Sequence, residues 1–250
     1  MGEERDTDEP FGGSGGYRER VSRLAGAVLW TRTTLSARPV PPDGCMDLIW
    51  SGGRLPVAGP GTGPHLPGDV VSGALSRGPG GRGGAPIVGL RFAPGQGPAV
   101  FGVPARELRD QRVPLADLWP AGRVRELAGR LAEAGAADSG SGVGRLLEET
   151  AAVRLRDGTT TARLRDATAT GGPMVALSER QLHRLSPDAF GYGPKTLTRV
   201  LRLVRALDLA RSGMPYAQVA VRAGYADQAH LAREVKSPAG APMGVLLAPG

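Results

Sequence analysis

Several residue types are scarce in this sequence, and each scarcity excludes a class of protein. The chain has one cysteine and no Cys-x-x-Cys spacing, so an internal disulfide scaffold and a four-cysteine zinc site are excluded. No apolar run approaches the roughly 18 residues that a membrane-spanning helix needs. The N-terminal residues are acidic and no apolar run follows them, so we expect no signal peptide and a reducing, cytoplasmic location.

Glycine and proline, in contrast, are abundant. The 250 residues include 39 Gly and 22 Pro, with 40% hydrophobic and 22% charged residues. This composition supplies enough apolar surface for a core, while the many turn-forming residues favour short elements. It excludes both a disordered chain and a single long helical rod.

The positive charge is concentrated in one part of the chain. Residues 1–150 contain 17 Arg and 17 acidic residues, whereas residues 151–250 contain 12 Arg and 2 Lys against 7 acidic residues. The formal net charge of +7 therefore lies entirely in the last 100 residues. A basic segment of domain size beside a neutral one is typical of a protein that binds a polyanion.

The apolar pattern changes along the chain and predicts an α+β protein. Short apolar runs between Pro/Gly clusters predict strands of a small barrel or sandwich. They lie at residues 25–31, 45–50, 55–59, 69–75, 87–93 and 98–103. A short helix is expected over 17–24, and after Pro104 apolar residues three and four apart predict helices, with Leu127 and Leu131 on one face. Composition suggests a disordered tail (1–16), a β-rich domain (17–133), a linker (134–144) and a helical, basic domain (145–250).

Two short helices are predicted near the C-terminus. Residues 216–222 are compatible with a helix, Gly224 supplies a turn, and Asp227 can cap a second helix. Leu231 and Val235 fall on one face of that helix, where they can pack on Val219, Ala220 and Ala223 of the first. This pattern predicts a helix-turn-helix.

Polar and small side chains occupy the other face of the second helix, which comprises Gln228, Ala229, Ala232, Arg233 and Lys236. Gln suits adenine and Arg suits guanine in the major groove of DNA, while Lys236 near the helix end suits a phosphate. An ordinary amphipathic helix pair with a solvated Arg has the same spacing, so the residues alone leave both interpretations open.

A similar segment lies upstream. Ser178 and Gln181 form a capping box that starts a helix, with Leu182 and Leu185 facing inward. The side chains left outside are Arg180, Gln181, His183 and Arg184. A long helix then begins at Pro194 and ends before Gly213.

These stretches resemble the DNA-binding domain of AraC-type transcriptional regulators, in which two helix-turn-helix modules are joined by a long helix. The resemblance lies in GYGPKTLTRVLRLVRAL, MPYAQVAVRAGYADQAHLAREV and AGAP. The N-terminal phrases PPDGCMDLIW, VAGPGTG, GLRFAPG, FGVPARELRD and PLADLW are similar to a subgroup with a cupin-like domain of unknown ligand. The resemblance implies sequence-specific binding of double-stranded DNA and control of transcription, with Gln228, Ala229, Ala232 and Arg233 in one recognition helix and Arg180, Gln181, His183 and Arg184 in the other. A small-molecule effector, a contact with RNA polymerase and a homodimer are further partners to consider.

Some residues depart from the pattern. Gly171, Gly172 and Pro173 oppose the scaffold helix expected before the first recognition helix. Pro187 and Pro238 are expected to cut the two recognition helices short.

Signals for catalysis are weak. The GGSGG sequence at 12–16 lies in the predicted tail with no strand before it, so its match to a nucleophile elbow is attributed to chance. His65 is the only histidine of the β-rich part, which argues against a metal site, and Cys45 is expected to be a small buried residue. Trp30, Trp50, Phe92 and Phe101 are expected mainly in the core.

The sequence therefore predicts a DNA-binding transcriptional regulator without catalytic residues, metal or cofactor. One alternative is a regulator whose DNA-binding half has degenerated and acts by protein interaction. A weaker alternative is a small-molecule enzyme in the β-rich domain.

Overall fold

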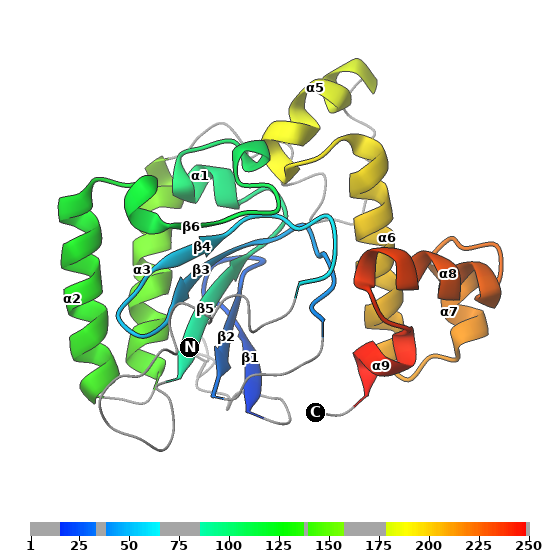
Figure 1. Cartoon of the computed structure of the whole chain (residues 1–250), viewed down its shortest axis with the longest axis horizontal. Coiled ribbons are helices and arrows are strands. Elements are labelled where there is room, and N and C mark those ends of the chain that lie inside the picture. The colour runs from blue at the N-terminus through cyan, green and yellow to red at the C-terminus, as the bar shows by residue number, and fades with distance from the viewer. Residues whose placement is uncertain (1–15, 34–38, 66–85, 138–139, 158–178, 249–250) are drawn as a thin grey trace, which may run out of the picture.

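The computed structural model describes residues 16–33, 39–65, 86–137, 140–157 and 179–248. Its N-terminal part contains one six-stranded antiparallel sheet with the order β1-β2-β5-β3-β4-β6 (Figure 1). The strands are β1 (Tyr17–Val21), β2 (Val28–Arg32), β3 (Met46–Trp50), β4 (Pro56–Ala58), β5 (Ile87–Phe92) and β6 (Arg112–Pro114). We refer to residues 16–157 as the sheet part.

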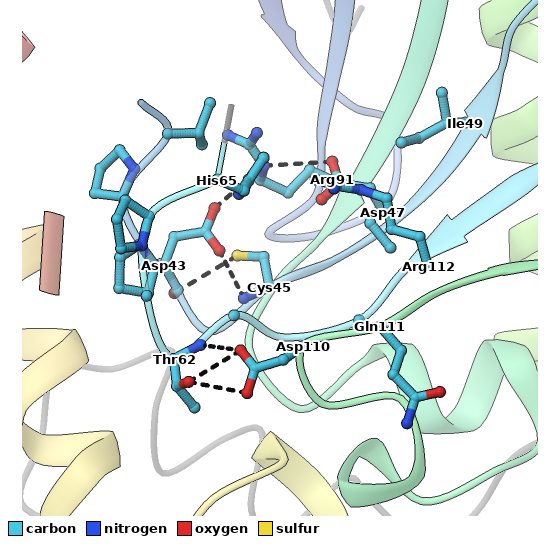
Figure 2. Close-up of a pocket in the computed structure, with 18 of the residues that line it drawn as sticks. Asp43, Cys45, Asp47, Ile49, Thr62, His65, Arg91, Asp110, Gln111 and Arg112 are labelled. Atoms are coloured by element: carbon cyan, nitrogen blue, oxygen red, sulfur yellow. Dashed lines mark hydrogen bonds and ion pairs between the residues drawn. The ribbon is translucent and has the colours of Figure 1, made fainter. Parts of the chain in front are cut away.

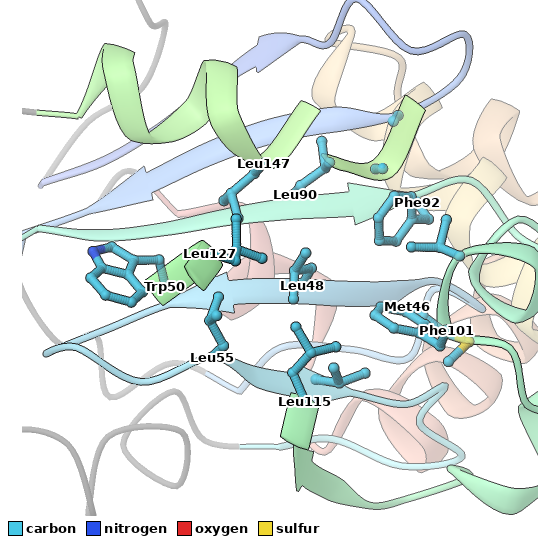
Figure 3. Packing of buried hydrophobic residues seen from close by; sticks show 14 of the residues in the cluster. Met46, Leu48, Trp50, Leu55, Leu90, Phe92, Phe101, Leu115, Leu127 and Leu147 are labelled. Atoms are coloured by element: carbon cyan, nitrogen blue, oxygen red, sulfur yellow. The ribbon is translucent and has the colours of Figure 1, made fainter. Parts of the chain in front are cut away.

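Helices cover one face of the sheet and enclose the main core (Figure 3). Alternate residues of β5, namely Val88, Leu90 and Phe92, are fully buried there, as period-two alternation requires. The covering elements are α1 (Gly97–Phe101), the 3₁₀ turns η2 (Ala105–Glu107) and η3 (Leu115–Asp117), α2 (Ala121–Ala137) and α3 (Ser141–Asp157). The predicted inward positions Leu127 and Leu131 of α2 are both buried in this core.

The C-terminal part, residues 179–248, is entirely helical (Figure 1). It comprises α5 (Glu179–Phe190), α6 (Pro194–Arg211), α7 (Tyr216–Arg222), α8 (Gln228–Ala239) and α9 (Met243–Leu247). Pro194 stands in the first turn of α6 as predicted, because its missing N–H would have no partner there. The predicted α+β class is thereby confirmed. Among the described residues, no helix is long and apolar enough to cross a membrane.

Some predictions of helix and strand within the sheet part are wrong. Residues 98–103 were expected as a strand, but Gly97–Phe101 form α1, which Pro98 starts and Gly102 ends in a left-handed conformation. The helix expected over 17–24 is instead β1, because each of its residues pairs with β2. The tail at 1–15, the run at 69–75 and the scaffold helix before Leu177 lie outside the described residues.

The segment predicted as a linker, residues 134–144, also differs. α2 continues to Ala137, α3 begins at Ser141, and Leu147 and Ala151 of α3 are buried in the sheet core. A Cβ at Gly144 would collide with the Leu29 side chain of β2, so this glycine allows close packing instead of a flexible link. Residues 141–157 thus pack with the sheet, although the basic domain was expected to start at 145.

Neither recognition helix is cut short at its proline. α5 continues past Pro187 to Phe190, and α8 continues past Pro238 to Ala239. Both prolines lie in the last turn, where the missing N–H costs a single hydrogen bond and few residues remain to be displaced.

Candidate functional site: a helix-turn-helix surface and a cavity on the sheet

Helices α7 and α8 pack as the sequence predicts. Gly224 has φ of 80° in the turn, and Asp227 accepts a hydrogen bond from the His230 N–H at 2.6 Å, which caps α8. Leu231 and Val235 are buried against a cluster that also contains Val219, Ala220 and Ala223. Because the turn and the cap are local signals, the sequence was sufficient to predict this unit.

The predicted contact face of α8 is exposed over its whole length. Its members are Gln228, Ala229, Ala232, Arg233 and Lys236. A helix that projects amide, guanidinium and ammonium groups between small residues can approach the floor of a DNA groove. The face therefore has the shape and the donors that base readout requires.

Acidic side chains are kept off this face by their own partners. Glu234 points instead toward α6, where its Oε2 lies 3.3 Å from Arg202 and 3.6 Å from Arg199. Asp208 pairs with Arg211, and Asp188 pairs with Arg106 of η2. On α8 itself the exposed charged side chains are Arg233 and Lys236, while the exposed Asp227 before its first residue caps the helix.

Helix α5 carries the second predicted contact set. Arg180, Gln181, His183 and Arg184 are all exposed. Leu185 packs on a cluster formed by Ala189, Phe190, Tyr192, Leu197 and Val200, which fixes α5 against the start of α6. Ser186 is fully buried and its hydroxyl donates to the Tyr192 carbonyl at 2.8 Å. The structure thus presents both predicted sets to solvent but on separate helices.

A second feature is a cavity of about 440 Å³ on the opposite face of the sheet from the main core (Figure 2). Its floor includes Trp30 of β2 and Ile49 of β3, both of which stand opposite Gly89 of β5 in the strand register. A Cβ at Gly89 would fall on the indole of Trp30, so the glycine lets that ring lie across the sheet. We call this space, bounded also by the loops at 40–45 and 59–65, the sheet cavity.

The carboxylates of the cavity lining already have partners (Figure 2). Asp43 and Asp47 lie 3.3 and 3.4 Å from the Nε of Arg91. Asp110 accepts hydrogen bonds from the backbone N–H and the hydroxyl of Thr62. Burial lowers the pKa of Arg91, but the charges of Asp47 and Asp43 outweigh it and hold that pKa well above its usual value.

Burial changes the protonation of both His65 and Cys45 in the cavity lining. Burial and the nearby charge of Arg112 lower the pKa of His65 to about 4, so it is neutral at pH 7. Burial raises the pKa of the Cys45 thiol well above its usual value, which suppresses the reactive thiolate. In the part of the chain that the structure describes, no three His, Cys, Asp or Glu side chains gather closely enough to hold a metal.

The sequence-based interpretation missed most of this cavity. Trp30, Trp50, Phe92 and Phe101 were all expected mainly in the core; the last three belong to the main core, whereas Trp30 lines the cavity. Alternate positions of β5 could have indicated Arg91 as a residue on the second face. Arg32 and Arg112 come from strands far apart in the sequence, and no local signal relates them.

The loops of the sheet cavity also touch the helical part. Pro60 packs against Gly191, and Pro64 packs against Gly240 at the end of α8. The Tyr192 hydroxyl is buried beside Gly44 with no hydrogen-bond partner among the described residues. Burial, together with the charges of Asp43 and Cys45, raises the pKa of Tyr192. One pair of loops therefore borders both the cavity and the α5–α6 junction.

Comparison with protein families gives one match: residues 173–247 fit the model of a helix-turn-helix domain. This part of the chain is therefore a helix-turn-helix DNA-binding domain. The match is to a domain of the AraC type and confirms the resemblance for these C-terminal residues. No curated protein sequence matches the chain.

Among solved structures, ToxT from Vibrio cholerae is similar across most of the chain. One ToxT structure at 1.65 Å resolution has 10% identity and a TM-score of 0.41, covering 94% of this chain and 100% of that chain. A ToxT structure with a bound unsaturated fatty acid has 11% identity and a TM-score of 0.36, covering 88% and 94%. These values describe a loose likeness of fold.

Proposed function

We propose that this protein is a sequence-specific DNA-binding regulator of transcription. The observation that supports the proposal best is the helix-turn-helix domain at residues 173–247, whose α8 presents an exposed face of Gln, Ala, Arg and Lys side chains. The concentration of positive charge in the same part of the chain supports it independently.

Within α8 each exposed side chain has a role that follows from its chemistry. Gln228 and Arg233 read base edges, because an amide pairs with adenine and a guanidinium fork pairs with guanine. Ala229 and Ala232 leave room for thymine methyl groups, and Lys236 in the last turn binds a phosphate. Arg180, Gln181, His183 and Arg184 of α5 form the second contact set.

The two parts of the chain have different roles in this proposal. The sheet part, residues 16–157, is the regulatory domain, and residues 179–248 are the DNA-binding domain. The sheet cavity receives a small-molecule effector, and the loops that touch Gly191 and Gly240 transmit its presence to α6 and α8. Such a protein acts in the cytoplasm, on the nucleoid, by occupying a promoter or by contacting RNA polymerase there, as a monomer or a homodimer.

The proposal is tested by selecting preferred sites from random duplex DNA with the purified full chain. Arg233→Ala should weaken the selected site by roughly 1–3 kcal/mol and relax the preference at one base position. Lys236→Ala should weaken all sequences alike and lower the salt dependence by about one unit. Arg123→Ala, which removes an exposed cation from α2 of the sheet part, is the matched control and should change neither.

Two results would reject this assignment. Absence of salt-dependent DNA binding would favour a protein-interaction role for the helices. An unchanged base preference in a folded Arg233→Ala protein would show that α8 is not the reader, and the base contacts would then be sought on α5.

A further inference from the structure

The carboxylates that line the sheet cavity have partners, whereas the guanidinium of one arginine, Arg32, has a buried nitrogen without one. Asp43 and Asp47 are engaged by Arg91, and Asp110 is engaged by Thr62. Arg32, the last residue of β2, also lines the described part of the cavity. A ligand in this cavity thus meets carboxylates that are already satisfied and at least one guanidinium that is not.

Arg32 is a half-buried cation in an environment that lacks a counter-charge. Its Nε is buried without a hydrogen-bond partner, and no carboxylate pairs with it among the described residues. Its guanidinium carbon lies 5.0 Å from the centroid of the Tyr17 ring, which is a cation–π contact. Burial, together with the neighbouring charge of Arg91, lowers the pKa of Arg32, so the charged form is less favourable here than in water.

Apolar side chains form part of the cavity floor beside Arg32. Trp30 lies across Gly89, Ile49 stands next to it in the register, and the Tyr17 ring is 6.2 Å from that of Trp30. The volume of about 440 Å³ is within the range of small-molecule sites. The accessible part of the Trp30 residue, 8%, borders the cavity, so the apolar body of a ligand can contact it while a single negative charge reaches the guanidinium.

We propose that the sheet cavity binds a small organic monocarboxylate with an apolar body, whose carboxylate pairs with Arg32. A single cation without a partner is neutralised by a single negative charge. A monocarboxylate is therefore favoured over a phosphate dianion, whose second charge would have no partner. A charge-assisted hydrogen bond in a half-buried site supplies the preference for the anion. This inference rests on the proposed function only in identifying the ligand as the effector.

The test uses three probes with one shared body: indole-3-acetate, its neutral amide and the cationic indole-3-ethylamine. Calorimetric titration of the full chain at pH 7 should show the carboxylate binding at least about tenfold more tightly than the amide or the amine. Equal binding of the three probes, or binding of none, would overturn the proposal.

Variants of Arg32 identify the group responsible. Arg32→Gln should remove the preference for the carboxylate, whereas Arg32→Lys should retain part of it because the charge remains. Arg123→Gln on α2 is the matched control and should bind the probes like the original chain. If Arg32→Gln melts at the original temperature and still prefers the carboxylate, Arg32 is not the anion partner and the proposal is wrong.

The two proposals fail separately, because the titration requires no DNA. Loss of the carboxylate preference with DNA selection intact would refute only the ligand class. Intact carboxylate binding without salt-dependent DNA binding would refute only the proposed function.

Discussion

Arg202 of α6 connects the long helix to the turn and to α8 of the second helix-turn-helix module. Its guanidinium lies 3.3 Å from Glu234 of α8, 4.4 Å from the ring centroid of Tyr225, and 3.4 Å from the Gly224 carbonyl. The Arg202 and Glu234 side chains are 26% and 31% exposed, so their ion pair contributes about 0.5–1 kcal/mol. The stacking on Tyr225 adds roughly 0.5–2 kcal/mol, while the long hydrogen bond to Gly224 adds little.

Arg202→Ala should therefore lower the free energy of opening α8 by about 1–3 kcal/mol. A change of about 1.4 kcal/mol in the free energy of opening changes the opening equilibrium constant tenfold. The amides of α8 should therefore exchange roughly 5- to 150-fold faster. Hydrogen exchange followed by mass spectrometry on the full chain measures this effect locally. Arg205→Ala removes an exposed arginine from the same helix and is the matched control. If both variants exchange α8 amides at the same rate, Arg202 does not hold the recognition helix and the reasoning fails.

Three further predictions concern packing and protonation. Leu231→Ala should destabilise the helical part by about 2–5 kcal/mol in denaturant titrations, because Leu231 is fully buried, whereas Val221→Ala, at a 72% exposed position, should have little effect. Gly89→Ala should displace the Trp30 indole at a cost of roughly 1–3 kcal/mol and change the tryptophan fluorescence; an unchanged spectrum would contradict the position of that ring. His65 has a folded-state pKa of about 4, below its unfolded value, so protons bind preferentially to the unfolded chain and stability falls as the pH decreases from about 6.5 towards 4. The His65→Gln protein should lose less stability over that pH range. If the melting temperatures of the two proteins fall equally as the pH decreases, this prediction is refuted.

The helix-turn-helix was predictable because its signals are local. Gly224 reaches positive φ without strain, Asp227 accepts from an N–H three residues away, and Pro194 fits the first turn of α6. Each of these residues acts within about one helical turn of its position, so the order of amino acids is sufficient to specify it. The same locality explains why the exposed face of α8 was identified correctly from spacing alone.

Local composition was misleading where packing between distant segments decided the structure. Gly144 was assigned to a linker by its composition, yet it permits α3 to approach Leu29 of the sheet. Residues 17–21 have no strong strand signal, but hydrogen bonds to β2 make them a strand. Pro238 was expected to end α8, whereas the buried Val235 and Ala239 hold the last turn in helical form.

The division between sequence and tertiary structure is clearest in the two parts of the candidate site. Helical period, caps and turn residues determined α7, α8 and their exposed face, because those interactions span only a few residues. The sheet cavity depends on strand order and register, which place Trp30, Ile49 and Gly89 side by side and bring Arg91 next to Asp47. Only the assembled sheet could show that Arg32 faces the cavity, because the contacts that surround it come from separate strands and loops whose pairing no local pattern specifies.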